Sequence, residues 1–214
     1  MLRTGAAIAA RFRAVPESTA FFVCDIQEKF RRHIYEFRNV INTASKMARV
    51  AQELQIPVIA TEQSPERLGP TVSEIDPSWC TLVLPKTRFS MCTSRVTAFL
   101  HEHDIQTVVL FGIEAQAHIC ITQTCLDLRM RMPHVHAIVL ADGCSSINRG
   151  EIPIALAALR DAGCTVSSSE AVVFQLLRDA AHPKFGAVLR IVKEYGDETS
   201  TAVETFGRAS LCGM

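Results

Sequence analysis

The segment TVVLFGIEAQAHICITQTCLDLRM, residues 107–130, is the clearest indication of how the chain folds. It opens with Thr107–Phe111, a short and almost unbroken apolar run that is typical of a strand buried on both faces. Residues Ile119–Met130 then space their apolar side chains as a helix does, and Pro133 lies just beyond their end. A buried strand followed by a helix predicts one unit of a parallel sheet, because parallel strands need a long crossover between them.

The same alternation continues on both sides of this segment. Further strands are expected at Ala20–Cys24, Pro57–Ala60, Leu82–Leu84, Val135–Ala141 and Cys164–Val166. Further helices are expected at Val40–Leu54, Arg95–His103, Glu151–Ala162, Ser169–Arg178 (with Ser169 as the cap) and Pro183–Glu194. Right-handed crossovers between these strands predict an α/β fold, a three-layer, doubly wound, mainly parallel six-stranded sheet with helices on both faces.

The chain divides into three parts by composition. Residues 1–18 form a basic segment, residues 19–194 form the single folded domain, and the polar residues 195–214 are expected to form a C-terminal arm. The first fourteen residues carry three arginines and no acid, so the location is either cytoplasmic or, if they are a targeting signal, mitochondrial. The long loop Glu62–Pro77 is equally consistent with an active-site lid and with a surface excursion.

Charge and cysteine content exclude several classes of function. The chain has 22 basic and 22 acidic residues, so it lacks the positive charge that favours nucleic acids. No apolar stretch reaches the roughly 20 residues that a membrane helix needs. The eight cysteines form no C-x-x-C motif, and several lie in apolar runs, which favours buried free thiols in a reducing compartment.

Three reactive side chains follow predicted strands. Asp25 comes directly after the first strand, Lys86 follows the third, and Cys120 begins the helix after the fourth. Ligands bind at the carboxyl ends of parallel strands, so we expect the three to meet. A cysteine at a helix N-terminus has a favoured thiolate, a carboxylate can take and return its proton, and an ammonium stabilises both anions. Free backbone N–H groups at the helix start could bind an oxyanion.

Each residue alone also has an ordinary structural explanation. Cys120 could be a packing thiol, Asp25 a turn residue and Lys86 a surface lysine. A Cys–His pair with His118 is the rival mechanism, although residues two apart on a helix do not face each other. The motif ADGCSS, residues 141–146, is explained equally well by a turn and by a contribution to the same edge of the sheet.

The motifs themselves resemble a known family. The resemblance rests on FFVCDIQEKF (21–30), PKTRFS (85–90) and FGIEAQAHICITQTCLDL (111–128), with support from TEQSPERLGPTVSE (61–74), ADGCSS and QLLRDAAHPKF (175–185). These segments are similar to the isochorismatase-like cysteine hydrolase superfamily, and within it to the eukaryotic isochorismatase-domain-containing proteins. The similarity covers roughly residues 19–193.

This resemblance implies roles for particular residues. The family's Asp–Lys–Cys triad falls on Asp25, Lys86 and Cys120, and its D-x-Q pattern on Gln27, with Phe30 in the same stretch. The family's cis peptide, whose N–H helps to form the oxyanion hole, falls near Ala115–Gln116. The stretch from Gly112 to Cys120 is about two residues longer than the family pattern, so His118 is the alternative at the place given to Cys120.

The resemblance also limits the substrate. Nicotinamidases hold a metal through Asp and His residues after the second strand, where this chain has Glu62 and Glu66 but no histidine. Nicotinamidase activity is therefore disfavoured, and no metal or other cofactor is predicted. Members with isochorismatase activity lack the cysteine, so a vinyl ether is disfavoured as well.

Together these features predict a metal-independent cysteine hydrolase that acts on a small amide or a related carbonyl compound. The pocket is expected to be lined by Gln27, Phe30, Trp79, Arg88 and Phe89. The expected partners are a small-molecule substrate and further copies of the chain, since homo-oligomers are common in the family. The alternatives are a non-catalytic binding or scaffold protein and a ribonuclease, the latter disfavoured by the neutral charge.

Overall fold

The fold is centred on one parallel sheet. The computed structural model describes residues 13–114 and 119–211. Six strands, in the order β3-β2-β1-β4-β5-β6, form the sheet, and every neighbouring pair is parallel. The strands are β1 (Thr19–Cys24), β2 (Val58–Gln63), β3 (Leu82–Lys86), β4 (Thr107–Glu114), β5 (His136–Ser146) and β6 (Thr165–Ser167). This confirms the predicted doubly wound architecture.

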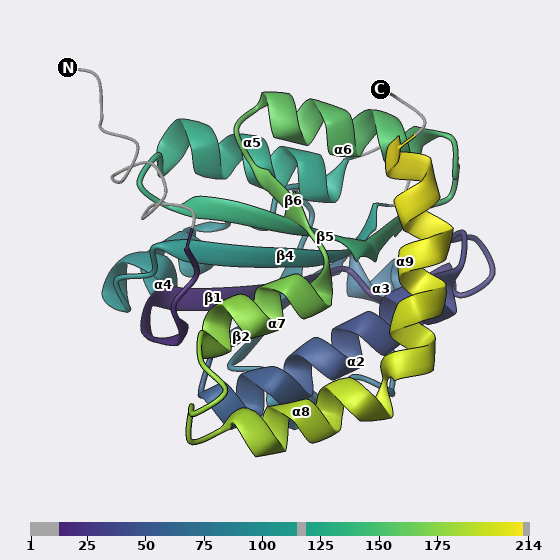
Figure 1. Cartoon of the computed structure of the whole chain (residues 1–214). Helices are drawn as coiled ribbons and strands as arrows, with labels where there is room; N and C mark the ends of the chain where they lie inside the picture. Colours follow the sequence, from purple (N-terminus) through teal and green to yellow (C-terminus); the bar gives the residue numbers. More distant parts are fainter. Residues whose placement is uncertain (1–12, 115–118, 212–214) are drawn as a thin grey trace.

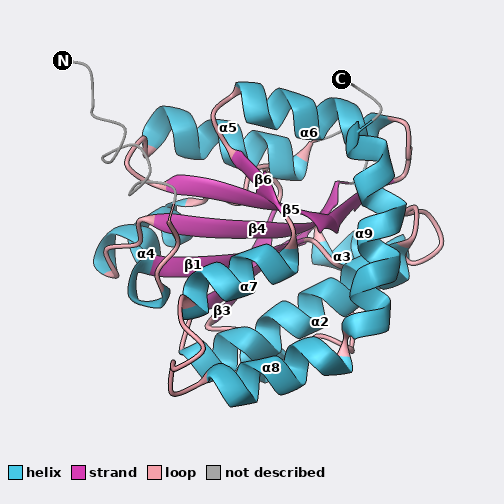
Figure 2. Ribbon diagram, in the orientation of Figure 1, coloured by secondary structure: helices cyan, strands magenta, loops and turns pink. Residues whose placement is uncertain are grey.

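Helices cover both faces of the sheet (Figures 1 and 2). The α-helices are α2 (Phe37–Leu54), α3 (Pro65–Leu68), α4 (Ser94–Glu102), α5 (Cys120–Arg131), α6 (Glu151–Asp161), α7 (Ser169–Leu177), α8 (Phe185–Glu194) and α9 (Gly196–Leu211). Three 3₁₀ turns are also present, η1 (Pro16–Ser18), η2 (Glu28–Phe30) and η3 (Pro77–Trp79). Helices α5 and α6 cover one face and α2 and α7 lie against the other, while α8 packs on α2, and α9 runs across the end of the sheet and contacts α2, β5 and α6 (Figure 2).

The central strands β1 and β4 form the core of the molecule. All six residues of β1 are buried, as are residues 107–113 of β4. Phe21 and Phe111 meet edge to face across the two strands, with ring centroids 6.1 Å apart. Burial on both faces explains why these strands are nearly continuous apolar runs. Among the described residues, no helix is long and apolar enough to cross a membrane.

The C-terminal residues differ from the expected arm. Helix α9 packs against α2 and the far end of β5, as Figure 1 shows in yellow. Its Ala202 and Phe206 are buried in the core, and the Phe206 ring lies 6.2 Å from that of Tyr35. The polar composition of this segment reflects the exposed face of an amphipathic helix whose other face completes the core.

The start of α7 also differs from the expectation. Ser168, not Ser169, caps the helix, since its Oγ accepts a hydrogen bond from the N–H of Ala171. Ser169 is buried instead, and its N–H donates to Asp142 Oδ1 at 2.8 Å. Two adjacent serines compete for the cap, and the demand of the buried Asp142 for donors decides between them.

Candidate active site

The three predicted residues meet where the sheet changes direction. The chain leaves β1 toward β2 and β3, and leaves β4 toward β5 and β6, so β1 and β4 border the topological switch point. Asp25 follows β1, Lys86 ends β3, and Cys120 is the first residue of α5. Such a switch point leaves a crevice at the carboxyl ends of the strands, because the two connections diverge there.

Lys86 connects the other two side chains. Its Nζ lies 2.7 Å from Asp25 Oδ2 and 3.7 Å from Cys120 Sγ, and all three residues are buried. Nζ also donates to Gln63 Oε1 at 2.8 Å and to the carbonyl oxygens of Arg88 and Phe89 at 3.1 and 2.9 Å. A buried ammonium needs such partners, since an unpaired one would cost several kcal/mol, on the order of 3–5.

The Asp25 carboxylate is held from both sides. Its Oδ1 accepts a hydrogen bond from Thr61 Oγ1 at 2.8 Å, while Oδ2 takes Lys86. The backbone of Asp25 has a φ of +52°, a left-handed conformation that aspartate tolerates better than most residues. This turn directs the carboxylate away from the strand and toward the crevice, and strain of this kind clusters at functional sites.

The nucleophile candidate is fixed at the first turn of α5. Thr124, one turn further along, donates its Oγ1 hydrogen to the carbonyl of Cys120 at 2.6 Å and accepts from the Met91 N–H at 2.9 Å. These bonds connect α5 to the loop after β3, which also carries Arg88 and Phe89. The Cys120 thiol therefore stands at a helix N-terminus, where the free N–H groups favour negative charge.

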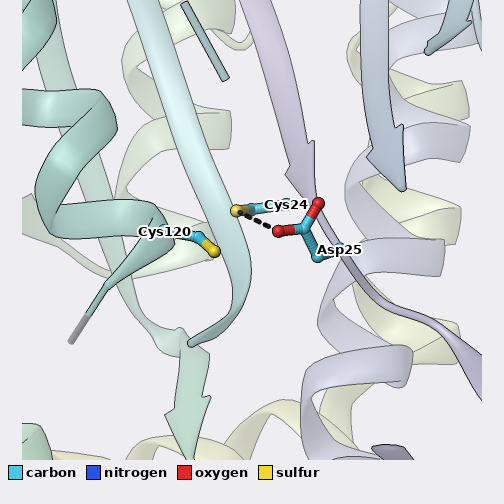
Figure 3. Close-up of side chains that lie close together, drawn as sticks. All are labelled: Cys24, Asp25 and Cys120. Carbon is cyan, nitrogen blue, oxygen red and sulfur yellow. Dashed lines mark hydrogen bonds between the residues drawn. The ribbon is translucent and has the colours of Figure 1, made fainter. Parts of the chain in front are cut away.

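A second thiol lies in the same cluster. Cys24, the last residue of β1, is fully buried, and its Sγ lies 3.7 Å from Asp25 Oδ2. The Sγ atoms of Cys24 and Cys120 and an oxygen of Asp25 all lie within 4.8 Å of one another. Figure 3 shows both sulfur atoms and the carboxylate pointing into one small space.

The protonation of the cluster follows from these contacts. Burial alone lowers the pKa of Lys86, but the groups around it, Cys24, Asp25 and Cys120, outweigh burial and leave that pKa raised. Burial, the thiol of Cys120 and the charge of Asp25 raise the pKa of Cys24 well above its usual value. At neutral pH the site thus contains a lysine ammonium and a protonated Cys24 thiol.

Both polar atoms of the Gln27 side chain bind backbone groups next to the site. Its Nε2 donates to the carbonyls of Gln63 and Gly69 at 3.1 and 2.6 Å, and its Oε1 accepts from the Gln63 N–H at 2.8 Å. It thereby fixes the end of β2 and the loop that follows. Gln63 was missed by the sequence analysis, although it ends β2 at the same edge of the sheet, which is the signal that pointed to Lys86.

The remaining proposed pocket residues divide into three groups. Arg88 and Phe89 lie beside the site and are more than half exposed, with Arg88 3.4 Å from Asp127 on α5. Phe30 is buried in the core at η2. Trp79 is not at the site, because it lies before the start of β3 and lines a groove between α2 and α8 with Arg49 and Arg190. Lys86 is at the other end of that strand.

The predicted oxyanion residues Ala115, Gln116 and His118 lie outside the described residues. Their roles, and the family's cis peptide near Ala115–Gln116, stay predictions.

The ADGCSS segment contributes to structure rather than to the site. Asp142 accepts from both the N–H and the hydroxyl of Ser169, and the Ser145 hydroxyl donates to the carbonyl of Tyr35. Lys46 Nζ completes this second polar cluster, 2.6 Å from Ser169 Oγ and 2.7 Å from Thr199 Oγ1. The cluster joins α2, β5, α7 and α9.

Comparisons with known proteins agree with this arrangement. The model of the isochorismatase domain matches residues 19–171. The chain belongs to the isochorismatase family. It is 42% identical over 189 residues to the isochorismatase domain-containing protein 2A of Mus musculus, covering 88% of this chain and 89% of that protein. The fold is therefore that of the isochorismatase-family hydrolases. The arrangement of the buried Asp25, Lys86 and Cys120 is consistent with a catalytic triad.

Solved structures of two other proteins superpose on the chain. The MAR1 ribonuclease of Caenorhabditis elegans is 35% identical, with a TM-score of 0.79 over 85% of this chain and 92% of that one. The YcaC gene product of Escherichia coli, described as an octameric hydrolase of unknown specificity, is 14% identical, with a TM-score of 0.75 over 92% of this chain and 97% of that one. At that identity the second likeness shows the fold alone.

Proposed function

We propose that this isochorismatase-family protein is a metal-independent cysteine hydrolase of small amides or related carbonyl compounds. The observation that carries the proposal is the position of Lys86 Nζ, 2.7 Å from Asp25 Oδ2 and 3.7 Å from Cys120 Sγ in a buried crevice. A lysine is rarely buried unless its charge is paired, and here the ammonium lies next to both a proton acceptor and a nucleophile.

In the proposed reaction Asp25 accepts the proton of Cys120, and the thiolate attacks the carbonyl carbon of the substrate. The N–H groups at the start of α5 stabilise the oxyanion of the tetrahedral intermediate. Asp25 then delivers its proton to the leaving amine, which leaves an acyl group on Cys120. A water molecule, deprotonated by Asp25, hydrolyses this thioester and restores the thiol.

Lys86 makes a metal ion unnecessary in this scheme. Its ammonium stabilises the thiolate and the carboxylate when each carries a negative charge, and its raised pKa keeps it protonated through the cycle. The side chains of Arg88 and Phe89, at the end of β3, are the proposed contacts for the substrate.

Alkylation of Cys120 tests the proposal without knowledge of the substrate. Iodoacetamide should modify Cys120 at neutral pH at least about tenfold faster than a buried, inactive thiol. Cys92 is the matched control, since it is as deeply buried and burial raises its pKa to about 11. Peptide mapping after timed quenching gives both rates. Lys86→Met should slow the reaction of Cys120 and leave that of Cys92 unchanged.

The substrate class is then found by screening small amides for released amine, with Cys120→Ala as the inactive control and a chelator that should leave activity intact. Equal alkylation rates for Cys120 and Cys92 would contradict the hydrolase and support a binding or scaffold protein that kept the fold.

Ribonuclease activity is the second candidate, because the name of the C. elegans relative at 35% identity carries it. The formal charge of this chain is zero, which argues against tight binding to a polyanion. Cleavage of a fluorogenic RNA that is lost in Cys120→Ala would favour this candidate over the amide hydrolase.

Oligomerisation and location are further parts of the proposal. A homo-oligomer is proposed because homo-oligomers are common in the isochorismatase family, to which the chain belongs. Both cytoplasmic and mitochondrial locations remain predictions, since residues 1–12 of the basic segment lie outside the described residues.

A further inference from the structure

The proposed hydrolase mechanism uses one thiol of the active site and leaves the other without a role. Cys24 lies between β2 and β4 in the middle of the sheet, paired with Thr61 on one side and Gly112 on the other. Its Sγ contacts the Asp25 carboxylate at 3.7 Å and lies within 4.8 Å of Cys120 Sγ (Figure 3). A thiol that only filled space would have no reason to face the nucleophile and its base.

A metal ion is the first use to consider for these atoms. Among the described residues, Cys24, Asp25 and Cys120 are the group of metal-ligand side chains whose donor atoms come together. The position between them is already taken by a cation, however, because Lys86 Nζ lies 2.7 Å from the carboxylate and 3.7 Å from Cys120 Sγ. A metal would have to displace a buried ammonium and its five partners, so thiol chemistry suits the cluster better.

We propose that Cys24 and Cys120 are a modification site, an internal disulfide that forms when a hydroperoxide oxidises Cys120 and that thiol reductants reverse. The inference goes beyond the proposed hydrolase, and it rests on that proposal in one respect, the reactivity of Cys120. The pair would protect the nucleophile from irreversible oxidation.

The chemistry balances with the hydroperoxide as the oxidant. The Cys120 thiolate attacks the terminal oxygen, an S–O bond forms, the O–O bond breaks, and the departing alkoxide takes the proton that the thiol lost. Asp25 then accepts the proton of Cys24, whose sulfur attacks the sulfenic acid of Cys120. The S–S bond forms, the S–O bond breaks, and hydroxide leaves with that proton as water. Two thiols are oxidised by two electrons, and the hydroperoxide is reduced to an alcohol and water.

The surroundings of Cys24 fit this second step. Its neighbour Asp25 supplies the base that a thiol with a raised pKa requires. Lys86, 3.7 Å from Cys120 Sγ, stabilises the thiolate in the first step. Hydrogen peroxide is hardly larger than water, so it should reach Cys120 by the route that the proposed substrate uses.

Cys125 and Cys164 are a second pair of neighbouring thiols, and the experiment has to distinguish a link between them from the proposed link. Contact with Cys125 lowers the pKa of Cys164, so these two thiols also lie together. Trypsin separates the possible cross-links, because Cys24 lies in the peptide of residues 14–29, Cys164 in 161–178, and Cys120 and Cys125 in 96–129. Fragmentation of the linked peptide then distinguishes Cys120 from Cys125.

The experiment treats the reduced full-length chain with hydrogen peroxide, blocks free thiols, and maps peptides by mass spectrometry without reduction. The expected result is the loss of two hydrogens from the intact mass before blocking, and a link between Cys24 and Cys120 that dithiothreitol reverses. Cys24→Ser should show no link, and its Cys120 should gain two oxygens as a sulfinic acid that dithiothreitol does not restore. Cys92→Ser, the matched buried control, should form the link as the wild type does.

Two results would overturn the inference. One is wild-type Cys120 that gains oxygen with no link to Cys24, an outcome that needs no variant. The other is Cys24→Ser that recovers its free Cys120 as fully as the wild type. The alkylation rate of Cys120 in the reduced chain separates the two proposals: fast alkylation without a link defeats the disulfide alone, whereas slow alkylation defeats the hydrolase as well.

Discussion

The substitution Gly112→Ala should separate the two central strands at the active site. Gly112 lies on β4 opposite Cys24 and has a φ of +138°. A Cβ added there would lie 2.2 Å from the carbonyl oxygen of Cys24 and 2.8 Å from its nitrogen, far inside van der Waals contact. Both atoms belong to a buried backbone that is paired on both sides, so they cannot move aside as a flexible side chain would.

The cost has two parts. A non-glycine residue in such a backbone conformation is strained by about 1–3 kcal/mol, and overpacking of a core costs another 1–3 kcal/mol or so. We therefore expect a loss of about 2–6 kcal/mol of unfolding free energy, and each kcal/mol lowers the Tm of a chain of this size by about 2–4 °C. Because the strain falls on Cys24 and the adjoining Asp25, the fast alkylation of Cys120 should be lost too.

Urea unfolding, followed by circular dichroism, measures the change. Gly186→Ala is the matched control, the same substitution at an exposed helix position with no atom within 4 Å of the added Cβ. It should be neutral or stabilising by up to about 1 kcal/mol, since alanine is the better helix former. Equal unfolding free energies for the two variants would show that the clash with Cys24 is not destabilising, because the same methyl group is added in both.

Two further predictions concern α9 and the buried lysine of the site. Phe206→Ala should lower the free energy of unfolding by about 3–5 kcal/mol, measured in urea, because the ring is fully buried. Val203→Ala, on the exposed face of α9, is the control and should change that free energy little. Equally small effects of the two substitutions would indicate that residues 195–214 form the loosely attached arm predicted from the sequence. Lys86→Met should cost about 3–5 kcal/mol at neutral pH because it leaves Asp25 buried without its partner. The folded-state pKa of Lys86 lies above its usual 10.5, so its contribution to stability is complete below pH 10.5 and is lost as the pH rises through the folded-state pKa. The difference between wild type and Lys86→Met should therefore shrink in strong base, and a difference that grows there would contradict the ion pair.

The order of apolar runs and helical periods in the chain was enough to predict the class of fold and the edge of the sheet at which the reactive residues meet. Six buried apolar runs separated by helical periods allow few other topologies, because parallel crossovers have one hand. Asp25, Lys86 and Cys120 were found by a rule that needs only the order of the strands, namely that the residues after parallel strands share one edge.

The neighbours of individual polar residues could not be predicted in this way and were found only in the folded chain. Lys46 has partners at Ser169 and Thr199, which are 123 and 153 residues away, so nothing local in its helix shows that it is buried. The burial of Phe206 on α9 likewise depends on distant segments. The same holds for the position of Trp79, which the sequence placed in the pocket and the structure places in a groove between α2 and α8. The physical reason is that local patterns fix the period of an element, whereas contacts between elements depend on where distant segments pack.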